Sequence, residues 1–325
     1  MTARTAVVTG ITGQDGHYLA ALLRSEGVVV HGTTRPGVRA DGTLPDLPPG
    51  TVCHEVDPTD PVAVAAVLDA VAPDYVFHLA GMSSVAASWD DPVHAARSNG
   101  LSVVAVLDAA LRLRDRTGRP VTVVNASSCE IFAGAPDVRQ AEGTPVRPIS
   151  PYGASKAFGH HMVQAYRARG LAASNAILYH HESPRRPERF VTRKITRGVA
   201  RIAAGRQDRL VLGDLSVRRD WGWAPDYVDA MYAMALRETG DDYVVATGED
   251  HSIEDFVATA FAAAGIDDWQ DLVVGDSALI RPADRPAMIG DATKAWEVLN
   301  WKPTTSFHDI VVKMVDSDTT QERDA

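Results

Sequence analysis

A short β-branched run followed at once by regularly spaced glycines does most to limit what this chain can fold into. Residues 5–9 (TAVVT) indicate a buried strand. Gly10, Gly13 and Gly16 follow with G-x-x-G-x-x-G spacing, before a helical pattern that ends at Gly27. Glycines there permit a tight turn and let a pyrophosphate approach the backbone at a helix N-terminus. The motif predicts a dinucleotide site, with a glycine-rich turn that holds no ligand as the alternative.

Strand and helix patterns continue to alternate through the first half of the chain. Apolar, β-branched runs at 28–35, 75–81 and 121–127 are separated by amphipathic segments, of which 98–118 is a long one. Strands that alternate with helices form parallel βαβ units covered on both faces. We therefore expect an α/β fold built on a Rossmann-type, doubly wound parallel sheet.

The pattern changes beyond about residue 180, where arginine and proline become frequent. A strand at 243–248 and a helix at 252–265 follow, so we expect a smaller C-terminal α/β domain that binds the substrate. The expected division is residues 1–180 for the cofactor, with about 213–248 returning to that domain, and 181–325 mainly for the substrate.

Composition excludes several classes of protein. The 325 residues carry a formal net charge of −10, which does not suggest a nucleic-acid partner. No apolar run reaches membrane-spanning length, the N-terminus lacks a signal-peptide pattern, and Cys53 and Cys129 fit no disulfide or metal spacing. We expect a cytoplasmic protein with no membrane partner and no metal, and a frayed polar tail at 316–325.

The end of the second predicted strand indicates which dinucleotide binds. An acidic residue there favours the ribose hydroxyls of NAD, whereas this chain has Arg35 and Arg39 and no acid. A guanidinium suits a 2′-phosphate, so NADP is the expected cofactor. The alternative is that Arg35 is a solvated loop charge.

Tyr152 and Lys156 stand four residues apart, after the strand predicted at 121–127. On a helix they share one face, and the lysine charge would lower the pKa of the phenol and make it a base near neutral pH. Ser127 and Ser128 end the preceding strand, and ligands bind at the carboxyl ends of strands in such folds. These residues predict a site that binds a substrate hydroxyl and removes its proton.

Several longer strings give the chain a resemblance that runs nearly end to end. They include SSCE (127–130), SPYGASK (150–156), HESPRRPERFVTRKI (181–195), RRDWGWAPDYVDAM (218–231) and GDATKAWEVLNWKP (290–303). The chain resembles the extended short-chain dehydrogenase/reductase superfamily and, within it, the GDP-mannose 4,6-dehydratase family. The resemblance implies an NADP-dependent hydro-lyase that converts a GDP-hexose, GDP-mannose first, into its 4-keto-6-deoxy form.

The resemblance also implies a role for individual residues. Tyr152, with Ser128 and Lys156 beside it, would take the proton of the C4 hydroxyl while hydride passes to NADP. Glu130 would take the C5 proton as water leaves from C6, and the hydride would then return to C6. The implied cofactor contacts are Gly10, Thr12, Gly13, Gln14, Asp15, Gly16, Arg35, Asp57, Leu79, Ala80, Tyr152, Lys156, His181 and Arg186. The implied substrate contacts are Ser83, His180, Lys194, Arg219 and Arg281.

This sequence departs from the family pattern at a few positions. His180 stands where the family has asparagine, so another GDP-hexose or a GDP-heptose stays an alternative substrate. Cys129 stands in place of a serine and is interpreted as a buried, inert thiol. Pro58 lacks the N–H that meets adenine in the family. The segments after Arg35 and before Arg281 are short, so we expect a homodimer, with a tetramer as the alternative.

Two further classes of function are open. A nucleotide-sugar 4-epimerase or 4-reductase shares the Tyr152/Lys156 pair but has no need of Glu130 as a base at C5. A non-catalytic nucleotide-sensing protein has no reason to keep all four catalytic groups together. The adjacent histidines at 160–161 and 180–181 permit a metal site, which is disfavoured because neighbours in sequence point apart.

Overall fold

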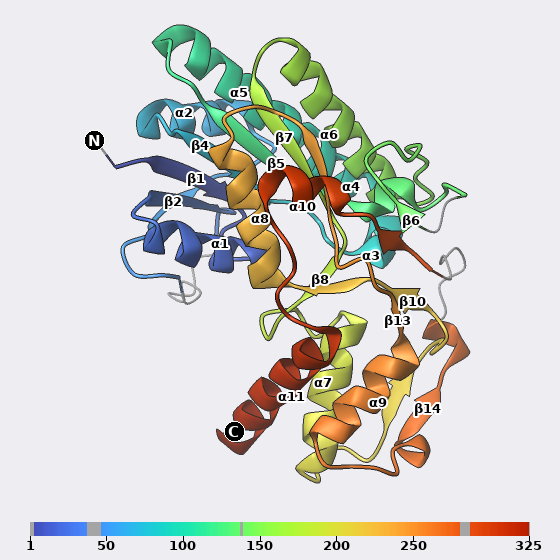
Figure 1. Cartoon of the computed structure of the whole chain (residues 1–325). Coiled ribbons are helices and arrows are strands. Elements are labelled where there is room, and N and C mark those ends of the chain that lie inside the picture. Colours follow the sequence, from blue (N-terminus) through green and yellow to red (C-terminus); the bar gives the residue numbers. More distant parts are fainter. Residues whose placement is uncertain (1–2, 38–46, 137–138, 280–286, 325) are drawn as a thin grey trace.

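The structure, a computed structural model, describes residues 3–37, 47–136, 139–279 and 287–324. At its centre lies a sheet of seven parallel strands in the order β12-β7-β5-β4-β1-β2-β3 (Figure 1). These strands are β1 (Thr5–Thr9), β2 (Val29–Thr34), β3 (Val52–Glu55), β4 (Tyr75–His78), β5 (Thr122–Ser128), β7 (Ala172–Leu178) and β12 (Asp242–Val245). The expected doubly wound parallel sheet is confirmed. Its order changes direction at β1, so the switch point that binds ligands in such sheets lies where β1 and β4 end.

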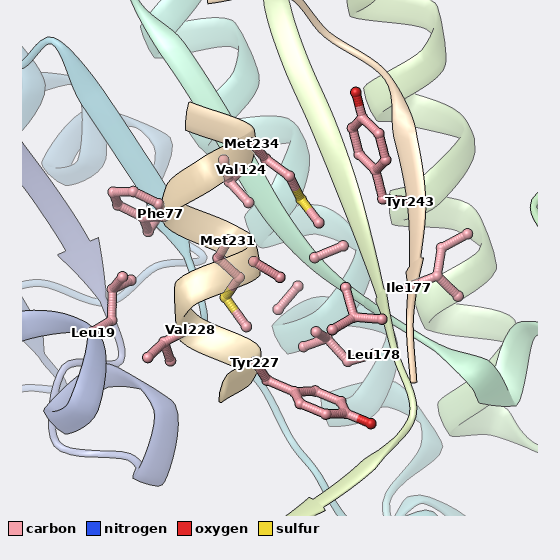
Figure 2. Packing of buried hydrophobic residues seen from close by; sticks show 14 of the residues in the cluster. Leu19, Phe77, Val124, Ile177, Leu178, Tyr227, Val228, Met231, Met234 and Tyr243 are labelled. Carbon is pink, nitrogen blue, oxygen red and sulfur yellow. The ribbon is translucent and has the colours of Figure 1, made fainter. Parts of the chain in front are cut away.

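Helices cover both faces of the sheet, because successive strand residues point to opposite, equally buried sides. Val123 and Val124 are each at most 1% exposed and belong to different cores. Figure 2 shows Leu19 and Met231 packed in the core that contains Val124. The helices over that core are α1 (Gln14–Ser25) and α8 (Ala224–Leu236), and those over the other are α2 (Pro61–Val71), α5 (Ser102–Thr117) and α6 (Pro151–Ala168).

A smaller lobe carries a third apolar core and lies to one side of the sheet (Figure 1). Val199, Phe256 and Met314 have no exposed surface and lie within this core. Its helices are α7 (Val191–Ala203), α9 (Ile253–Ala263) and α11 (Phe307–Asp324). Its short strands pair as β9 (Leu210–Leu212) with β14 (Val273–Gly275) and as β10 (Arg218–Arg219) with β13 (His251–Ser252).

The chain crosses from the central sheet to the smaller lobe and back more than once. β8 (His180–Glu182) follows the sheet strand β7 closely and pairs with β11 (Trp221–Trp223), which leads directly into α8. α10 (Thr293–Leu299) packs on β12 and α8, late in the sequence. The remaining elements are α3 (Val85–Asp90), α4 (Pro92–Ala96), the π-helix η1 (Arg97–Leu101), the 3₁₀-helices η2 (Cys129–Phe132), η3 (Gln270–Leu272) and η4 (Ser277–Leu279), and the pair β6 (Arg139–Gln140) with β15 (Ile289–Gly290).

The structure corrects two expectations about helices. The helix expected over 98–118 is α-helical only from Ser102, because a π-helical turn precedes it. The tail does not fray as expected: α11 continues to Asp324 and buries Asp318 completely, 2.6 Å from Arg193 of α7. A polar sequence is compatible with burial when oppositely charged partners from another helix face it. In the described part of the chain, no helix is both long and apolar enough to cross a membrane.

Candidate active site

The glycine-rich turn after β1 is packed so closely that it excludes side chains. Gly10 has φ of +68°, and a Cβ atom there would lie 2.9 Å from the backbone of Ala80. A Cβ on Gly16 would lie 2.5 Å from the carbonyl oxygen of Gly10. Gly13 is the N-cap residue of α1, so the first N–H groups of this helix face the switch point. This cradle fits the pyrophosphate of a dinucleotide.

A buried hydrogen-bond chain, which the sequence did not reveal, joins the turn to β4. Thr9 Oγ1 accepts hydrogen bonds from the N–H groups of Leu79 and Ala80, each at 3.1 Å. The same hydroxyl lies 2.9 Å from His78 Nδ1, to which it donates its own hydrogen. Burial lowers the pKa of His78 to about 3, so this ring is a neutral acceptor. The ends of β1 and β4 are thereby held together beneath the predicted cofactor site.

Asp15 and His181, both predicted cofactor contacts, form a buried ion pair. His181 Nε2 lies 3.0 Å from each carboxylate oxygen of Asp15. Burial raises the pKa of Asp15, but the charge and hydrogen bond of His181 outweigh it, and the pKa is lowered overall. Gln14 donates to the carbonyl of His181 at 3.0 Å and accepts from the hydroxyl of Ser183 at 2.7 Å. The start of α1 and β8 are therefore joined by polar contacts.

The predicted catalytic residues come from the end of β5, from η2, which follows it directly, and from the start of α6. Ser150 caps α6 by accepting from the N–H of Gly153 at 3.0 Å, and Pro151 occupies the first turn. Lys156 Nζ donates to the carbonyl of Ala126 at 2.8 Å and lies 6.0 Å from the ring centroid of Tyr152. The helix thus presents tyrosine and lysine to the end of β5.

The electrostatics of this pair differ from the expectation. Burial raises the pKa of Tyr152 above its usual range, against the smaller opposing effects of a hydrogen bond with Ser128 and of the charge of Arg186. Burial also lowers the pKa of Lys156 to about 8. In the chain alone Tyr152 is a phenol, because burial outweighs the groups that lower its pKa. The expected lowering of the pKa of Tyr152 is therefore wrong for the protein without its cofactor.

One cavity of about 430 Å³ brings the predicted site residues together. Among the residues that line it are the four predicted catalytic ones, Ser128, Glu130, Tyr152 and Lys156. It also contains the predicted cofactor contacts Asp15, Leu79, His181 and Arg186, and the predicted substrate contacts Ser83, His180 and Arg219. Chemistry that needs a phenol, an ammonium and a carboxylate in one enclosed space is therefore sterically feasible here.

The other predicted residues that the structure describes do not line this cavity. Those of the turn and its support are Gly10, Thr12, Gly13, Gln14, Gly16 and Ala80. Arg35 follows β2 and Asp57 follows β3; the hydrogen bonds from Thr59 are the main reason that the pKa of Asp57 is lowered, and the charge of Arg35 contributes. Lys194 lies on α7 and does not line the cavity. Arg281 and Arg39 lie outside the described residues.

Sequence reasoning missed the wall that the smaller lobe supplies. Leu212, Ser216, Trp221, Ile253 and Leu279 line the cavity there. They come from short strands, loops and helix starts whose residues show no period that would assign them to a site. Of these, Trp221 stood within a string that carried the family resemblance, as did Ile253, which belongs to YVVATGEDHSIEDFV (243–257).

Arg219, which ends β10, lines the cavity. Arg219 is 6% exposed and donates to the carbonyl of Arg218 at 2.7 Å. Asp220 is fully buried and accepts from the N–H groups of Thr247, Gly248 and Gly290. These bonds fix the backbone beside Arg219, so its guanidinium is a positioned cation at the cavity.

Two further observations concern the Cys129 thiol and possible metal ligands. Burial raises the pKa of Cys129 well above its usual range, which agrees with an inert thiol. Among the described residues, no group of three or more His, Cys, Asp or Glu could hold a metal ion.

Fold and site together define a class of protein. A parallel sheet with a glycine-rich turn at its switch point, a Tyr/Lys pair on the helix beside the same edge and a smaller second lobe define an extended short-chain dehydrogenase/reductase. The family model for GDP-mannose 4,6 dehydratase matches residues 7–314. The chain belongs to the GDP-mannose 4,6-dehydratase family.

Individual proteins agree with this assignment. The chain is 42% identical to GDP-mannose 4,6 dehydratase 2 of Arabidopsis thaliana, over 97% of this chain and 87% of the relative. It is 35% identical to GDP-mannose 4,6 dehydratase of Homo sapiens, over 96% and 91% of the two chains. Among solved structures, the UDP-glucose 4-epimerase of Thermus thermophilus in complex with NAD superposes with a TM-score of 0.83, at 25% identity over 97% and 98% of the chains.

Proposed function

We propose that this protein catalyses the NADP-dependent 4,6-dehydration of GDP-mannose to GDP-4-keto-6-deoxymannose. The observation that carries the proposal is Glu130, a carboxylate in the same cavity as Tyr152 and two residues from Ser128. A nucleotide-sugar 4-epimerase or 4-reductase needs no base at C5, and the family assignment does not favour it either. Family membership and site chemistry therefore support one reaction.

The chain's own residues fit NADP. The glycine cradle at Gly10, Gly13 and Gly16 suits the pyrophosphate, and Arg35 suits the 2′-phosphate. Asp15 and Leu79, which lie close to this turn, also line the cavity. When bound, the dinucleotide supplies hydride acceptance and return. We assign cofactor binding to residues 1–180 with 213–248, and nucleotide-sugar binding mainly to 181–325.

The oxidation step depends on Tyr152. Its hydroxyl takes the proton of the C4 hydroxyl, and Ser128 donates a hydrogen bond to the same substrate oxygen. Because burial raises the pKa of Tyr152 in the chain alone, the phenolate needs a further positive charge in the filled site. Lys156, held on Ala126, supplies part of it.

The elimination step depends on Glu130. Oxidation at C4 makes the neighbouring C5–H acidic, and the carboxylate of Glu130 takes that proton. The proton then leaves with the C6 hydroxyl as water, which creates a C5–C6 double bond. Return of the hydride to C6, and to C5 of the proton that Tyr152 took from the C4 hydroxyl, would give the saturated 4-keto-6-deoxy product. A carboxylate in this place distinguishes a dehydratase from a dehydrogenase.

The smaller lobe supplies the groups proposed for the nucleotide-sugar. Arg219 lines the cavity and Lys194 lies on α7, and cations bind a diphosphate well. Ser83, which comes from the loop after β4 and not from the smaller lobe, and His180 also line the cavity and are proposed to contact the sugar. Arg281 belongs to the same proposed set. The cytoplasm is the proposed compartment, because the two cysteines of the sequence fit no disulfide framework.

A homodimer is the proposed assembly. Trp89 of α3, Val93 of α4, Leu101 of η1 and Phe158 of α6 are each at least 46% exposed, although they are large and apolar. α6 contacts all three other elements, so these side chains lie on neighbouring helices. An exposed apolar group of this kind marks an interaction surface. Light scattering should give twice the chain mass, and Trp89→Glu should give a monomer; an unchanged mass would contradict this dimer face.

One experiment tests the reaction. The protein is incubated with GDP-mannose that carries deuterium at C4, and the product is analysed by mass spectrometry. We expect loss of one water with the label moved to C6. A product from another GDP-sugar alone would overturn the substrate, and a 4-epimer formed without loss of water would overturn the reaction.

A further inference from the structure

One stripe of the catalytic helix carries polar side chains, of which His160 is buried, Lys156 and Arg167 are half-buried and Gln164 is exposed. Lys156, His160, Gln164 and Arg167 follow Tyr152 at steps of three or four residues, so they lie on one stripe of α6. His160 is only 3% exposed. Buried polar groups cost stability unless every hydrogen bond is made. The buried imidazole of His160 therefore calls for a functional reason.

The stripe is joined to three strands of the sheet. Asp242 of β12 accepts from Gln164 Nε2 at 2.7 Å and from Arg167 Nη2 at 2.6 Å. Asn175 of β7 donates to the carbonyl of His160 at 3.1 Å and to Asp242 at 2.9 Å. Ser127 of β5 lies 3.3 Å from His160 Nδ1. His160 is therefore held from both sides, between the outer strand and the end of β5.

These contacts determine which ring nitrogen of His160 carries the hydrogen. The Gln164 amide nitrogen donates to Asp242 and also lies 3.2 Å from His160 Nε2. An amide nitrogen cannot accept, so Nε2 must be the acceptor. The hydrogen then lies on Nδ1, which donates to Ser127 Oγ. The hydroxyl hydrogen of Ser127 is left to point elsewhere, and this residue lines the cavity.

The ring is also held neutral. Burial lowers the pKa of His160 to about 4. Among the described residues, the charged and titratable groups that act on it are Asp242 of β12, which raises its pKa, and His161 and Arg167 of α6, which lower it. At neutral pH the ring therefore adds no positive charge next to Lys156, one turn away.

The peptide group between Ala126 and Ser127 connects His160 to the proposed catalytic pair. Lys156 Nζ donates to the carbonyl of Ala126 at 2.8 Å, and the next residue is Ser127. We propose that His160 is a positioning residue for the catalytic pair. By donating to Ser127 it fixes the Ala126–Ser127 peptide, whose carbonyl oxygen holds the Lys156 ammonium near Tyr152. This inference rests on the proposed function, because Tyr152 and Lys156 act there.

Kinetics of matched variants test the proposal. His160→Phe keeps a ring but removes both nitrogens, whereas His160→Asn keeps a side-chain donor near the place of Nδ1. The neighbouring, exposed His161 provides the control His161→Phe. We expect His160→Phe to lower kcat on GDP-mannose by about tenfold at unchanged KM. We also expect the acidic limb of the plot of kcat against pH to move to higher pH. His160→Asn should recover most of both, and the control should match the wild type.

Several results would overturn the inference. One is a folded His160→Phe variant with the kcat and pH profile of the wild type. Another is a loss of kcat that His160→Asn does not restore and that parallels a lower melting temperature. If His160→Phe does not fold, Ser127→Ala must show the same shift of the acidic limb, and an unshifted limb would overturn the proposal.

A spectroscopic measurement separates this inference from the proposed function. Nitrogen NMR of histidine-labelled, NADP-bound protein should show His160 as the neutral Nδ1–H form at neutral pH; the Nε2–H form or an imidazolium would overturn the proposed hydrogen bond. Absence of any turnover of GDP-mannose by the wild type would instead refute the proposed function. Wild-type turnover together with the Nε2–H form would refute only the positioning role.

Discussion

Gly153, the residue after Tyr152, packs directly against Glu130, the proposed base at C5: a Cβ atom on Gly153 would lie 2.7 Å from the carbonyl oxygen of Glu130. This close approach brings η2 onto the first turn of α6 and so places a carboxylate and a phenol at one cavity. We expect Gly153→Ala to separate the two and to lower kcat by about 10²-fold. Steady-state kinetics test this, with Gly143→Ala as the control, because a Cβ on Gly143 meets nothing within 4 Å. Equal kcat in both variants would contradict the argument.

Removing the charge of Glu130 should separate the two halves of the reaction. In Glu130→Gln the C4 proton can still go to Tyr152, but no base takes the C5 proton. We expect dehydration to fall by about 10²–10⁴-fold, with reduced nicotinamide accumulating on the enzyme, which absorbance detects. Glu254→Gln, at an exposed position on α9, should behave like the wild type. Full turnover by Glu130→Gln would remove this residue from the mechanism.

A side chain on the first glycine should abolish cofactor binding. Gly10→Ala costs about 1–2 kcal/mol for its positive φ and also collides with the backbone of Ala80. Gly27 has a comparable φ of +75° with nothing within 4 Å, so Gly27→Ala reproduces the strain without the collision. Calorimetric titration with NADP should show lost affinity only for Gly10→Ala. Similar affinities of the two variants for NADP would mean that the collision with Ala80 does not affect cofactor binding.

The Asp15–His181 pair predicts how stability depends on pH. The pKa of His181 is raised: burial lowers it, but the charge and hydrogen bond of Asp15 outweigh burial. Its stabilisation is therefore complete below the ordinary histidine pKa of about 6.5 and is lost as the pH rises through the raised value. The pKa of Asp15 is lowered, so its stabilisation is present above about 3.9 and is lost as the pH falls through the lowered value.

Melting temperatures measured across pH test this pair. The difference between the wild type and His181→Gln should be largest between those two limits and should shrink as the pH rises above about 6.5. His161→Gln, at an exposed position, should follow the wild type throughout. A difference that grows with rising pH would show that the pair is not ionised as described.

The buried acids of α11 predict that the C-terminal helix stabilises the smaller lobe. Asp318 has no exposed surface and lies 2.6 Å from Arg193, and Glu322 lies 3.0 Å from Arg197. Asp318→Ala leaves the buried guanidinium of Arg193 without its carboxylate partner and should destabilise the protein by about 3–5 kcal/mol. Denaturant unfolding measures this, with the exposed Asp316→Ala as the control. Equal stability of the two variants would show that Asp318 of α11 does not stabilise the smaller lobe.

Local patterns were enough for the parts of the site that neighbouring residues build. Gly10, Gly13 and Gly16 mark the turn because backbone geometry there depends on the turn itself, and Tyr152 and Lys156 share a face because helix geometry requires it. The parallel sheet also followed from strands that alternate with helices. In each case the signal is contained within a short stretch of chain.

Only the tertiary structure decided the properties that depend on residues distant in sequence. The raised pKa of Tyr152 follows from how deeply α6 is buried, which no spacing of residues reports. The tautomer of His160 depends on Gln164 and on Asp242, which lies far along the chain on the outer strand β12. The sequence by itself determined which chemical groups are present and which helix or strand carries them. Their protonation, hydrogen-bond direction and common cavity were decided by packing, because burial and long-range contacts set the local dielectric and the partners of each group.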